Sequence, residues 1–238
     1  MKSISFTLGA GFLALALSSY GAGPSPADVG DADSFGHNAQ YMGAVSGFVI
    51  LANDCTGLDL PPDQRCFVLG LPGSLTTFTA NDLCRIKLPK KATRTLIYPV
   101  LTFFENYQLQ NTTGFTVPNA LFDYSVTLSI ESSVLLDPSI IDPVTGLPAN
   151  GTLVFVFSPN RVVEDRTMVD GERSRKRLTF TRAGNAGISK ANLIAGGLTP
   201  AQADDLFKSA ITVHFNMTGR ARYVTDSTIT GNMRLFGD

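Results

Sequence analysis

The sequence predicts an all-β protein, an antiparallel β-sandwich with one short capping helix near residues 200–209, and a closed β-barrel is the alternative. Two stretches, 121–131 and 210–218, alternate strictly between apolar and polar residues. This period of two is typical of antiparallel strands that bury one face and expose the other. Turn residues separate most of the other strand-like runs, as expected for short connections between strands.

Seven further runs are rich in β-branched and aromatic residues, which favour strands. They are residues 44–52, 95–107, 152–158, 161–169, 173–182, 221–225 and 228–236. Pro99 interrupts the second run and predicts a sheet edge or a bulge there. The third run is apolar on both faces, so we expect it in the centre of a sheet.

Two connections stand out between these runs. Asp170-Gly171 predicts a tight hairpin turn, because Asp and Gly tolerate the positive φ that a type I′ turn requires. Residues 137–151 contain three prolines and two glycines, which predicts a long loop.

The predicted helix begins with a capping box. Thr199 and Gln202 stand three residues apart, and Pro200 occupies the first helical position. Ala203, Leu206 and Phe207 then form a short apolar stripe. We therefore expect this helix to pack over one end of the sheet.

The first 22 residues have the layout of a secretory signal peptide. Lys2 precedes an apolar run over 6–17, and small residues follow. A spanning helix needs about 20 apolar residues, so this run is too short for one. We expect residues 23–40 to be a flexible mature N-terminus and 41–238 a single β-rich domain. The mature protein is then secreted (extracellular, periplasmic or at the cell surface) and does not span a membrane.

The chain has three cysteines, Cys55, Cys66 and Cys84. Export permits a disulfide, and the odd number leaves one thiol free or paired between chains. A Cys55–Cys66 bridge is favoured, because it would close a loop rich in Pro and Asp that has little core of its own. Cys66–Cys84 remains an open alternative.

The composition excludes several classes of ligand. The net charge of −1 does not suit a nucleic-acid-binding domain, which is usually basic. The phosphate-binding glycine motifs are absent, so we expect no nucleotide cofactor. Two histidines and three scattered cysteines lack zinc spacing. Asp31 and Asp33 begin a calcium-loop pattern that fails at Phe35, so we expect no metal.

The sequence shows no catalytic constellation, and we favour a protein that is not an enzyme. His37 lies in the N-terminal segment, while His214 lies on the polar face of its strand and is a candidate base with no visible partner. Glu164 and Asp165 are adjacent, so on a strand they point to opposite faces. The other strand-associated acids are Glu105, Asp123 and Glu131.

Two basic clusters are candidate ligand-binding surfaces. The first contains Arg85, Lys87, Lys90, Lys91 and Arg94, and the second contains Arg173, Arg175, Lys176 and Arg177. Such clusters bind anionic glycans or envelope phosphates. They also guard exposed sheet edges against aggregation, which is the simpler interpretation for either cluster alone.

Three functions are compatible with these observations. The first is a secreted or cell-envelope protein of structural or binding character, with self-assembly through a donated strand from 23–40 as an extension. The second is a secreted hydrolase, based on carboxylates or on His214, that acts on envelope or extracellular polymers. The third is a binder of an anionic glycan or envelope component through a basic face.

Overall fold

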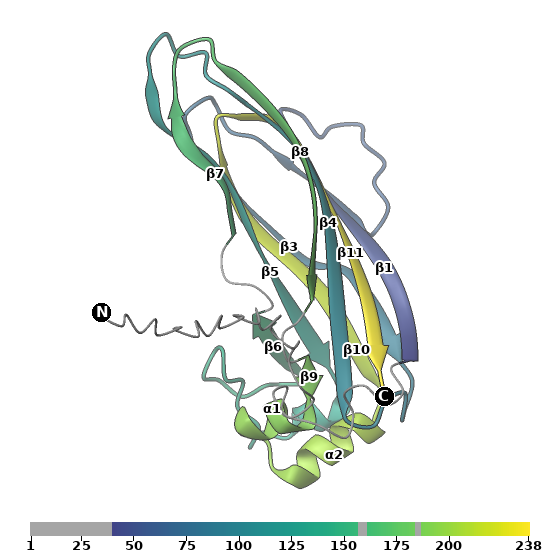
Figure 1. Ribbon diagram of the computed structural model, residues 1–238. Helices are drawn as coiled ribbons and strands as arrows, with labels where there is room; N and C mark the ends of the chain where they lie inside the picture. Colours follow the sequence, from purple (N-terminus) through teal and green to yellow (C-terminus); the bar gives the residue numbers. More distant parts are fainter. Residues whose placement is uncertain (1–39, 157–160, 184–186) are drawn as a thin grey trace, which may run out of the picture.

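The computed structural model describes residues 40–156, 161–183 and 187–238. Two β-sheets, A and B, pack face to face and do not close into a barrel (Figure 1), which confirms the predicted β-sandwich. The predicted signal peptide over 1–22 and the N-terminal segment over 23–39 lie outside the described residues. None of the helices in the described part of the chain is long and apolar enough to cross a bilayer.

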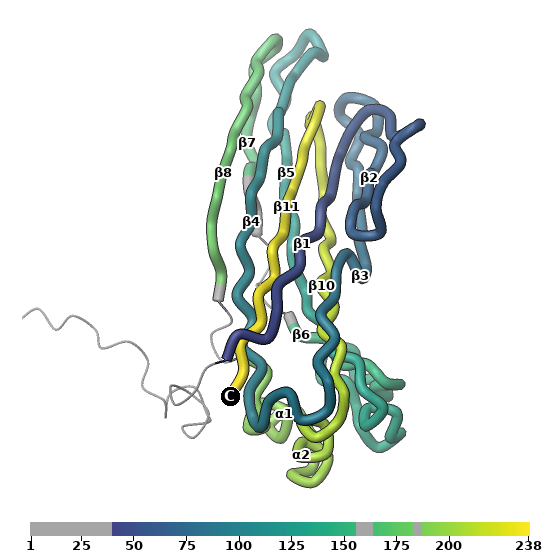
Figure 2. The backbone as a smooth tube through the Cα atoms, turned by 90° about the vertical axis from the view of Figure 1, so that its right-hand side faces the viewer, coloured from purple at the N-terminus to yellow at the C-terminus, as the bar shows by residue number. Residues whose placement is uncertain are grey.

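Sheet A has the strand order β2-β1-β11-β4-β8, with β9 pairing β4 beyond the end of β8. The strands are β1 (Gln40–Ala52), β2 (Gln64–Val68), β4 (Leu96–Gln110), β8 (Arg173–Ala183), β9 (Ile188–Ser189) and β11 (Val224–Gly237). Figure 2 shows β8, β4, β11 and β1 side by side. Only β1 and β2 pair in parallel within this sheet.

Sheet B has the order β3-β10-β5-β6, and β7 also pairs β5. Its strands are β3 (Thr76–Leu88), β5 (Val117–Glu131), β6 (Thr152–Val156), β7 (Arg161–Met168) and β10 (Ile211–Arg222). The predicted alternation is confirmed, since Phe122, Leu128 and Ile130 of β5 are fully buried. The central position predicted for 152–158 is wrong. Among the described strands, β6 pairs with β5 alone, while β10 pairs with the other side of β5, so β6 lies at the end of the strand order.

Pro99 lies in an interior strand rather than at a sheet edge. One neighbour of β4 is β11, which pairs Leu235 with Pro99. On the other side, the β8 ladder stops at Val100 and the β9 ladder starts at Ile97. Among the described residues of β8 and β9, none pairs with Pro99, so its missing N–H interrupts no described pairing on that side.

The Asp170-Gly171 turn connects the two sheets instead of forming a hairpin. A turn is present, but it is not type I′: Gly171 has φ +74°, whereas Asp170 does not have positive φ, and the Glu172 N–H donates to the Val169 carbonyl at 3.1 Å. However, β7 pairs with β5 in sheet B, whereas β8 pairs with β4 in sheet A. The β4–β5 connection crosses between the sheets in the same way, and Asn111 exchanges backbone hydrogen bonds of 3.0 Å with Glu172 and Gly171. The two crossings therefore support each other.

Two short helices, α1 (Lys190–Ala195) and α2 (Pro200–Lys208), cover one end of the sandwich (Figure 1). We call this the helix end and the other the loop end. The predicted capping box of α2 is confirmed, and its stripe of Ala203, Leu206 and Phe207 is buried. A single 3-10 turn, η2 (Ser133–Leu136), precedes the long loop over 137–151. The helices close the core where the strands end.

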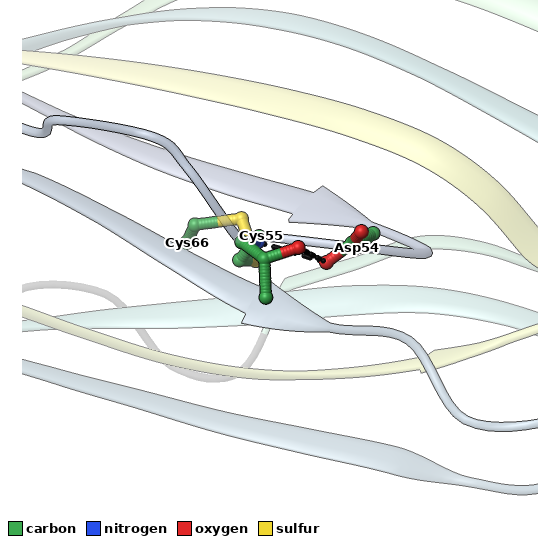
Figure 3. Close-up of a disulfide and its surroundings, with 4 residues drawn as sticks. Asp54, Cys55 and Cys66 are labelled. Carbon is green, nitrogen blue, oxygen red and sulfur yellow. Dashed lines mark hydrogen bonds between the residues drawn. A yellow bond between two sulfur atoms is a disulfide. The ribbon is translucent and has the colours of Figure 1, made fainter.

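The Cys55–Cys66 disulfide is present, with a Cα–Cα distance of 5.9 Å (Figure 3). It ties the loop after β1 to the five-residue strand β2. In the same loop, Asp54 accepts hydrogen bonds from the backbone and hydroxyl of Thr56. Cys84 is a buried free thiol, so the alternative Cys66–Cys84 bridge is wrong.

Candidate functional site

The candidate site begins at a bulge in β3. Phe215 of β10 pairs with Cys84, but Met217 pairs with Ala80, so β3 carries two more residues than β10 in this interval. Within the bulge, Asp82 has φ +49° and its N–H donates to the Asn216 side-chain oxygen at 2.8 Å. Bulges redirect side chains, and this one places the Asp82 carboxylate beside the outward face of β10.

His214 lies between two carboxylates on this face. Its Nδ1 is 2.7 Å from Asp82 Oδ1, and its Nε2 is 3.1 Å from Glu131 Oε2. A carboxylate only accepts hydrogen bonds, so both contacts form together when both ring nitrogens carry a proton. The three residues come from β3, β10 and β5, and the His214 side chain is only 12 % exposed. The ring is therefore fixed in orientation from two sides.

These side chains line a groove of about 390 Å³ on the outer face of sheet B. Hydroxyl and amide groups supply most of its remaining polar lining, from Thr127, Ser129, Thr152, Asn81 and Asn216. Asn216 is held in place by donating to the Ser129 hydroxyl at 3.2 Å. A groove of this kind offers many hydrogen-bonding groups at fixed positions, which suits a ligand with several hydroxyls.

Basic side chains border the groove along β3. Arg85 lies opposite His214 in the ladder and forms a 3.0 Å ion pair with Asp82. Lys87 lies opposite Thr212, and its side chain is exposed. Asp82 thus has two cationic or hydrogen-bonding neighbours, and the rim beyond it is positively charged.

The arrangement does not activate a nucleophile. Ser129 is paired with His214 in the ladder, but both ring nitrogens contact carboxylates and the Ser129 hydroxyl accepts from Asn216. The imidazole also fills the space between Asp82 and Glu131, which a pair of catalytic carboxylates would need for a sugar and a water. The groove can bind, orient and exchange hydrogen bonds with a ligand.

The first predicted basic cluster follows β3 from the groove to the helix end. Arg85 and Lys87 lie on the strand, and Lys90, Lys91 and Arg94 lie in the exposed loop that joins β3 to β4. The structure therefore brings this cluster together with the His214 groove along one edge of sheet B. The sequence alone indicated no link between the two.

The second predicted basic cluster lies at the loop end of sheet A. Arg173 pairs with Gln110, the last residue of β4, whereas the first residue of β4, Leu96, pairs with β9 at the helix end. Arg175 forms a 2.9 Å ion pair with Asp226, and the exposed Lys176 lies 2.9 Å from the buried Glu164. The two basic clusters therefore do not form one surface.

Two carboxylates lie between the sheets near the loop end. Glu105 is 2 % exposed and accepts a hydrogen bond from the Tyr124 hydroxyl. Glu164 accepts from the Tyr107 hydroxyl at 2.8 Å and contacts Lys176. Burial acts to raise the pKa of Glu164, but the Lys176 ammonium and the Tyr107 hydroxyl hold it below its usual value. As predicted, Asp165 points the other way and is exposed.

The described residues contain no group of three or more His, Cys, Asp or Glu side chains arranged to hold a metal ion. In the disulfide loop, Asp54 accepts hydrogen bonds from the backbone N–H and the hydroxyl of Thr56. The incomplete calcium pattern at Asp31 and Asp33, and His37, lie outside the described residues.

Sequence reasoning placed His214 on an outward face but did not identify its partners. Asp82 is 132 residues away, in a strand that was not predicted as such. The available signal was the Asn81-Asp82 pair inside a β-rich run, because two turn-forming residues in that setting indicate a bulge.

No known protein family matches the chain, and no curated protein sequence matches it. Among solved structures, the infectious bursal disease virus VP2 subviral particle is similar, with a TM-score of 0.22, 10 % identity, 84 % of this chain and 32 % of that chain covered. The Gx strain of that virus gives a TM-score of 0.18, 9 % identity and coverages of 84 % and 32 %. The T13 viral particle of infectious bursal disease virus gives a TM-score of 0.20 and 11 % identity, and the match covers 83 % of this chain and 38 % of that chain.

The chain thus spans about a third of the length of the virus chains it resembles. At these TM-scores the likeness carries no inference about what the protein does.

Proposed function

We propose that this is a secreted binding protein that holds an acidic oligosaccharide in the His214 groove and along the basic edge of sheet B. The observation that carries the proposal is the convergence of β3, β5, β6 and β10 on one polar groove of about 390 Å³. Hydroxyl and amide side chains in the groove would bind sugar hydroxyls. Cationic side chains beyond it would bind the acidic groups of the same chain.

The rim supports an anionic rather than a neutral ligand. The groove floor holds two carboxylates, Asp82 and Glu131, and Arg85 forms an ion pair with Asp82 at the rim. Lys87, Lys90 and Lys91 continue the edge and are exposed, with no ion pair to a described residue. An extended polyanion that leaves the groove along β3 would meet these three ammonium groups in succession.

Two further features support a role outside the cytoplasm. The N-terminal sequence has the layout of a signal peptide, and a disulfide stabilises the loop beside β2. Both suit an extracellular, periplasmic or surface location, where acidic polysaccharides are found. Self-assembly through the 23–40 segment remains a separate prediction.

Binding to polygalacturonate, with neutral dextran as the comparison, tests the proposal. We expect the purified protein to bind polygalacturonate and not dextran, and the affinity to fall between 50 and 300 mM salt, because exposed charges are screened (about 10 Å Debye length at 0.1 M). The triple variant Lys87→Glu, Lys90→Glu, Lys91→Glu should bind about tenfold more weakly or worse. Thr127→Tyr should also weaken binding, since it fills the groove without changing any charge.

The second basic cluster provides the matched control. Arg173→Glu with Arg177→Glu reverses charges at the opposite end of the molecule and should leave binding unchanged. Equal loss in both charge-reversal variants would mean that the protein attracts polyanions nonspecifically. Loss only in the Lys87 triple variant, with Thr127→Tyr unaffected, would separate the basic edge from the groove and overturn the proposed site.

A further inference from the structure

A second cavity lies at the loop end of the sandwich, away from the His214 groove. Its volume is about 360 Å³, within the range of small-molecule sites. Four connections form it: the start of the β1–β2 loop, the β2–β3 loop, the start of the β4–β5 crossing and the turn between β10 and β11. We call it the end pocket. It shares no residue with the groove, so its ligand is a separate question.

The lining of the end pocket contains no acidic or basic side chain. Amide and hydroxyl groups come from Asn53, Gln110 and Thr112, and an apolar wall comes from Leu69 and Val224, both 8 % exposed. A charged ligand would find no counter-charge in this pocket. A purely apolar ligand would leave the amides without partners, which is costly.

The pocket is braced in its open form. The Gly70 N–H donates to the Thr76 hydroxyl at 2.8 Å, and the Ser74 hydroxyl donates to the Leu71 carbonyl at 2.7 Å. These bonds fix the shape of the β2–β3 loop without any ligand. A preformed site loses little conformational freedom when a ligand enters.

Tyr223 adds a strained wall. Its φ is +61°, a region that bulky residues rarely adopt, and its carbonyl accepts from the Gln110 N–H at 2.9 Å. Its hydroxyl approaches the opposite loop so closely that a Cβ at Gly73 would lie 3.0 Å away. Such strain is concentrated at functional sites, and here it holds an aromatic ring in the pocket lining.

We propose that the end pocket binds a single neutral sugar ring that carries an acetamido group. The amide and hydroxyl side chains would pair with the sugar hydroxyls and the acetamido N–H. The apolar wall would receive the acetamido methyl. Leu71, at 83 % the most exposed large apolar side chain in the described part of the protein, borders the pocket and would cover the apolar face of the ring.

Titration with N-acetylglucosamine, followed by backbone amide shifts in NMR, tests this proposal. We expect shifts confined to residues around Gly70, Gln110 and Tyr223, and markedly weaker binding of glucose and of glucuronate. Gln110→Ala should reduce the affinity about fivefold, the cost of one hydrogen bond. Tyr223→Asn should abolish binding while keeping a folded spectrum, because Asn tolerates positive φ.

Two leucines in one loop give a matched pair of variants. Leu71 lines the pocket, whereas Leu75 is 42 % exposed and does not. Leu71→Ala should weaken binding and Leu75→Ala should not. Equal effects of the two, shifts centred on His214, or equally tight binding of glucuronate would each overturn the proposal. The groove variant Thr127→Tyr should leave this binding intact, so the two sites can fail independently.

Discussion

The carboxylate of Asp238 holds the loop between β3 and β4 in place through several hydrogen bonds. It accepts hydrogen bonds from the hydroxyls of Thr93 and Thr95 and from the backbone N–H groups of Arg94, Thr95 and Leu96. Burial acts to raise the pKa of Asp238, but these bonds lower it to about 2. The last residue therefore stabilises the β3–β4 loop, which carries three residues of the first basic cluster.

We expect Asp238→Asn to lower the free energy of unfolding at pH 7 by about 1 kcal/mol, allowing for the solvent that reaches the carboxylate. A depressed pKa contributes stability that is present above the usual value of 3.8 and is lost as the pH falls through about 2. Urea unfolding at pH 7 and pH 2.5 should show the difference shrinking. Asp205→Asn, at an exposed helix position, is the control and should have little effect.

Cys84 is predicted to be chemically inert in the folded protein. Burial raises the pKa of its thiol to about 12, with smaller contributions from Asp63 and Asp82. At pH 8 almost none of it is thiolate, the reactive form. A thiol reagent such as DTNB should therefore react with it only as fast as the protein unfolds, and denaturant should accelerate the reaction. Rapid stoichiometric labelling of the native protein would contradict this prediction.

Only part of the candidate site could be predicted from the sequence. Alternation placed His214 on an outward face, and its position is confirmed. The contact of His214 with Asp82 could not be predicted. The two residues are 132 positions apart, so their contact depends on the order of the strands in the sheet, which local periodicity does not determine. The first basic cluster could be recognised from the sequence, because its basic residues lie close together in the chain. That it lies beside the groove follows only from the pairing of β3 with β10.

At the scale of elements, a charged contact joins the two sheets at the β7–β8 crossing. Glu164 comes from sheet B, and its partners Lys176 and Tyr107 come from sheet A. Arg166 of β7 extends the contact to Glu172 at 2.7 Å. Because the crossing has no hairpin ladder of its own, these bonds help to hold β7 and β8 at the spacing of the sandwich.

We expect Glu164→Gln to reduce the free energy of unfolding by about 2 kcal/mol at pH 7, since it leaves the cations around a buried position uncompensated. The pKa of Glu164 is lowered from 4.5, so its contribution is present above that value and disappears at more acidic pH. Urea denaturation at pH 7 and pH 3 measures this. The neighbouring Asp165→Asn, on the exposed face, should change stability by much less. Equal effects of the two would refute the contact's role.

The Cys55–Cys66 bridge supports the shortest strand of sheet A apart from β9. It closes a loop with a sequence separation of 11. Replacing both cysteines by serine should cost about 2–3 kcal/mol, as for loops of this length. Hydrogen exchange should accelerate over Gln64–Val68 before it does in β4 or β11, because β1 is the one described strand that pairs with β2. Unchanged protection of β2 would show that its ladder suffices without the bridge.

The elements differ in how far they could be predicted. Strands with one solvated face, such as β5 and β10, follow from alternation, and α2 follows from its capping box. The strand β2 was missed because its residues directly follow the loop rich in Pro and Asp that the disulfide closes, and β3 was missed because its bulge interrupts the pattern. The position of the turn at Asp170-Gly171 was predicted correctly, but its type I′ geometry and its hairpin were not, because Asp170 lacks positive φ and the two strands pair with β5 and β4 in different sheets.

At the scale of the whole molecule, the pairing is dominated by strands far apart in the chain. The first described strand, β1, pairs with the last, β11, from Gln40 with Gly237 to Leu51 with Ser227. Such topologies fold slowly, because the loop entropy is lost before the contacts form. Stopped-flow refolding should give a time constant of about milliseconds to seconds. Refolding in microseconds would be inconsistent with this topology.

The start of β1 and the end of β11 lie together at the helix end, so the two ends of the sandwich differ. Gln40 and Gly237 lie side by side there, whereas Gln110, at the other end of the 15-residue strand β4, borders the end pocket. A strand of that length reaches about 50 Å. The described chain therefore enters β1 and completes β11 at the same end of the sandwich. A support or a fusion partner attached after Asp238 would hold the end pocket outward at the far end of the sandwich, and would leave the His214 groove on its flank.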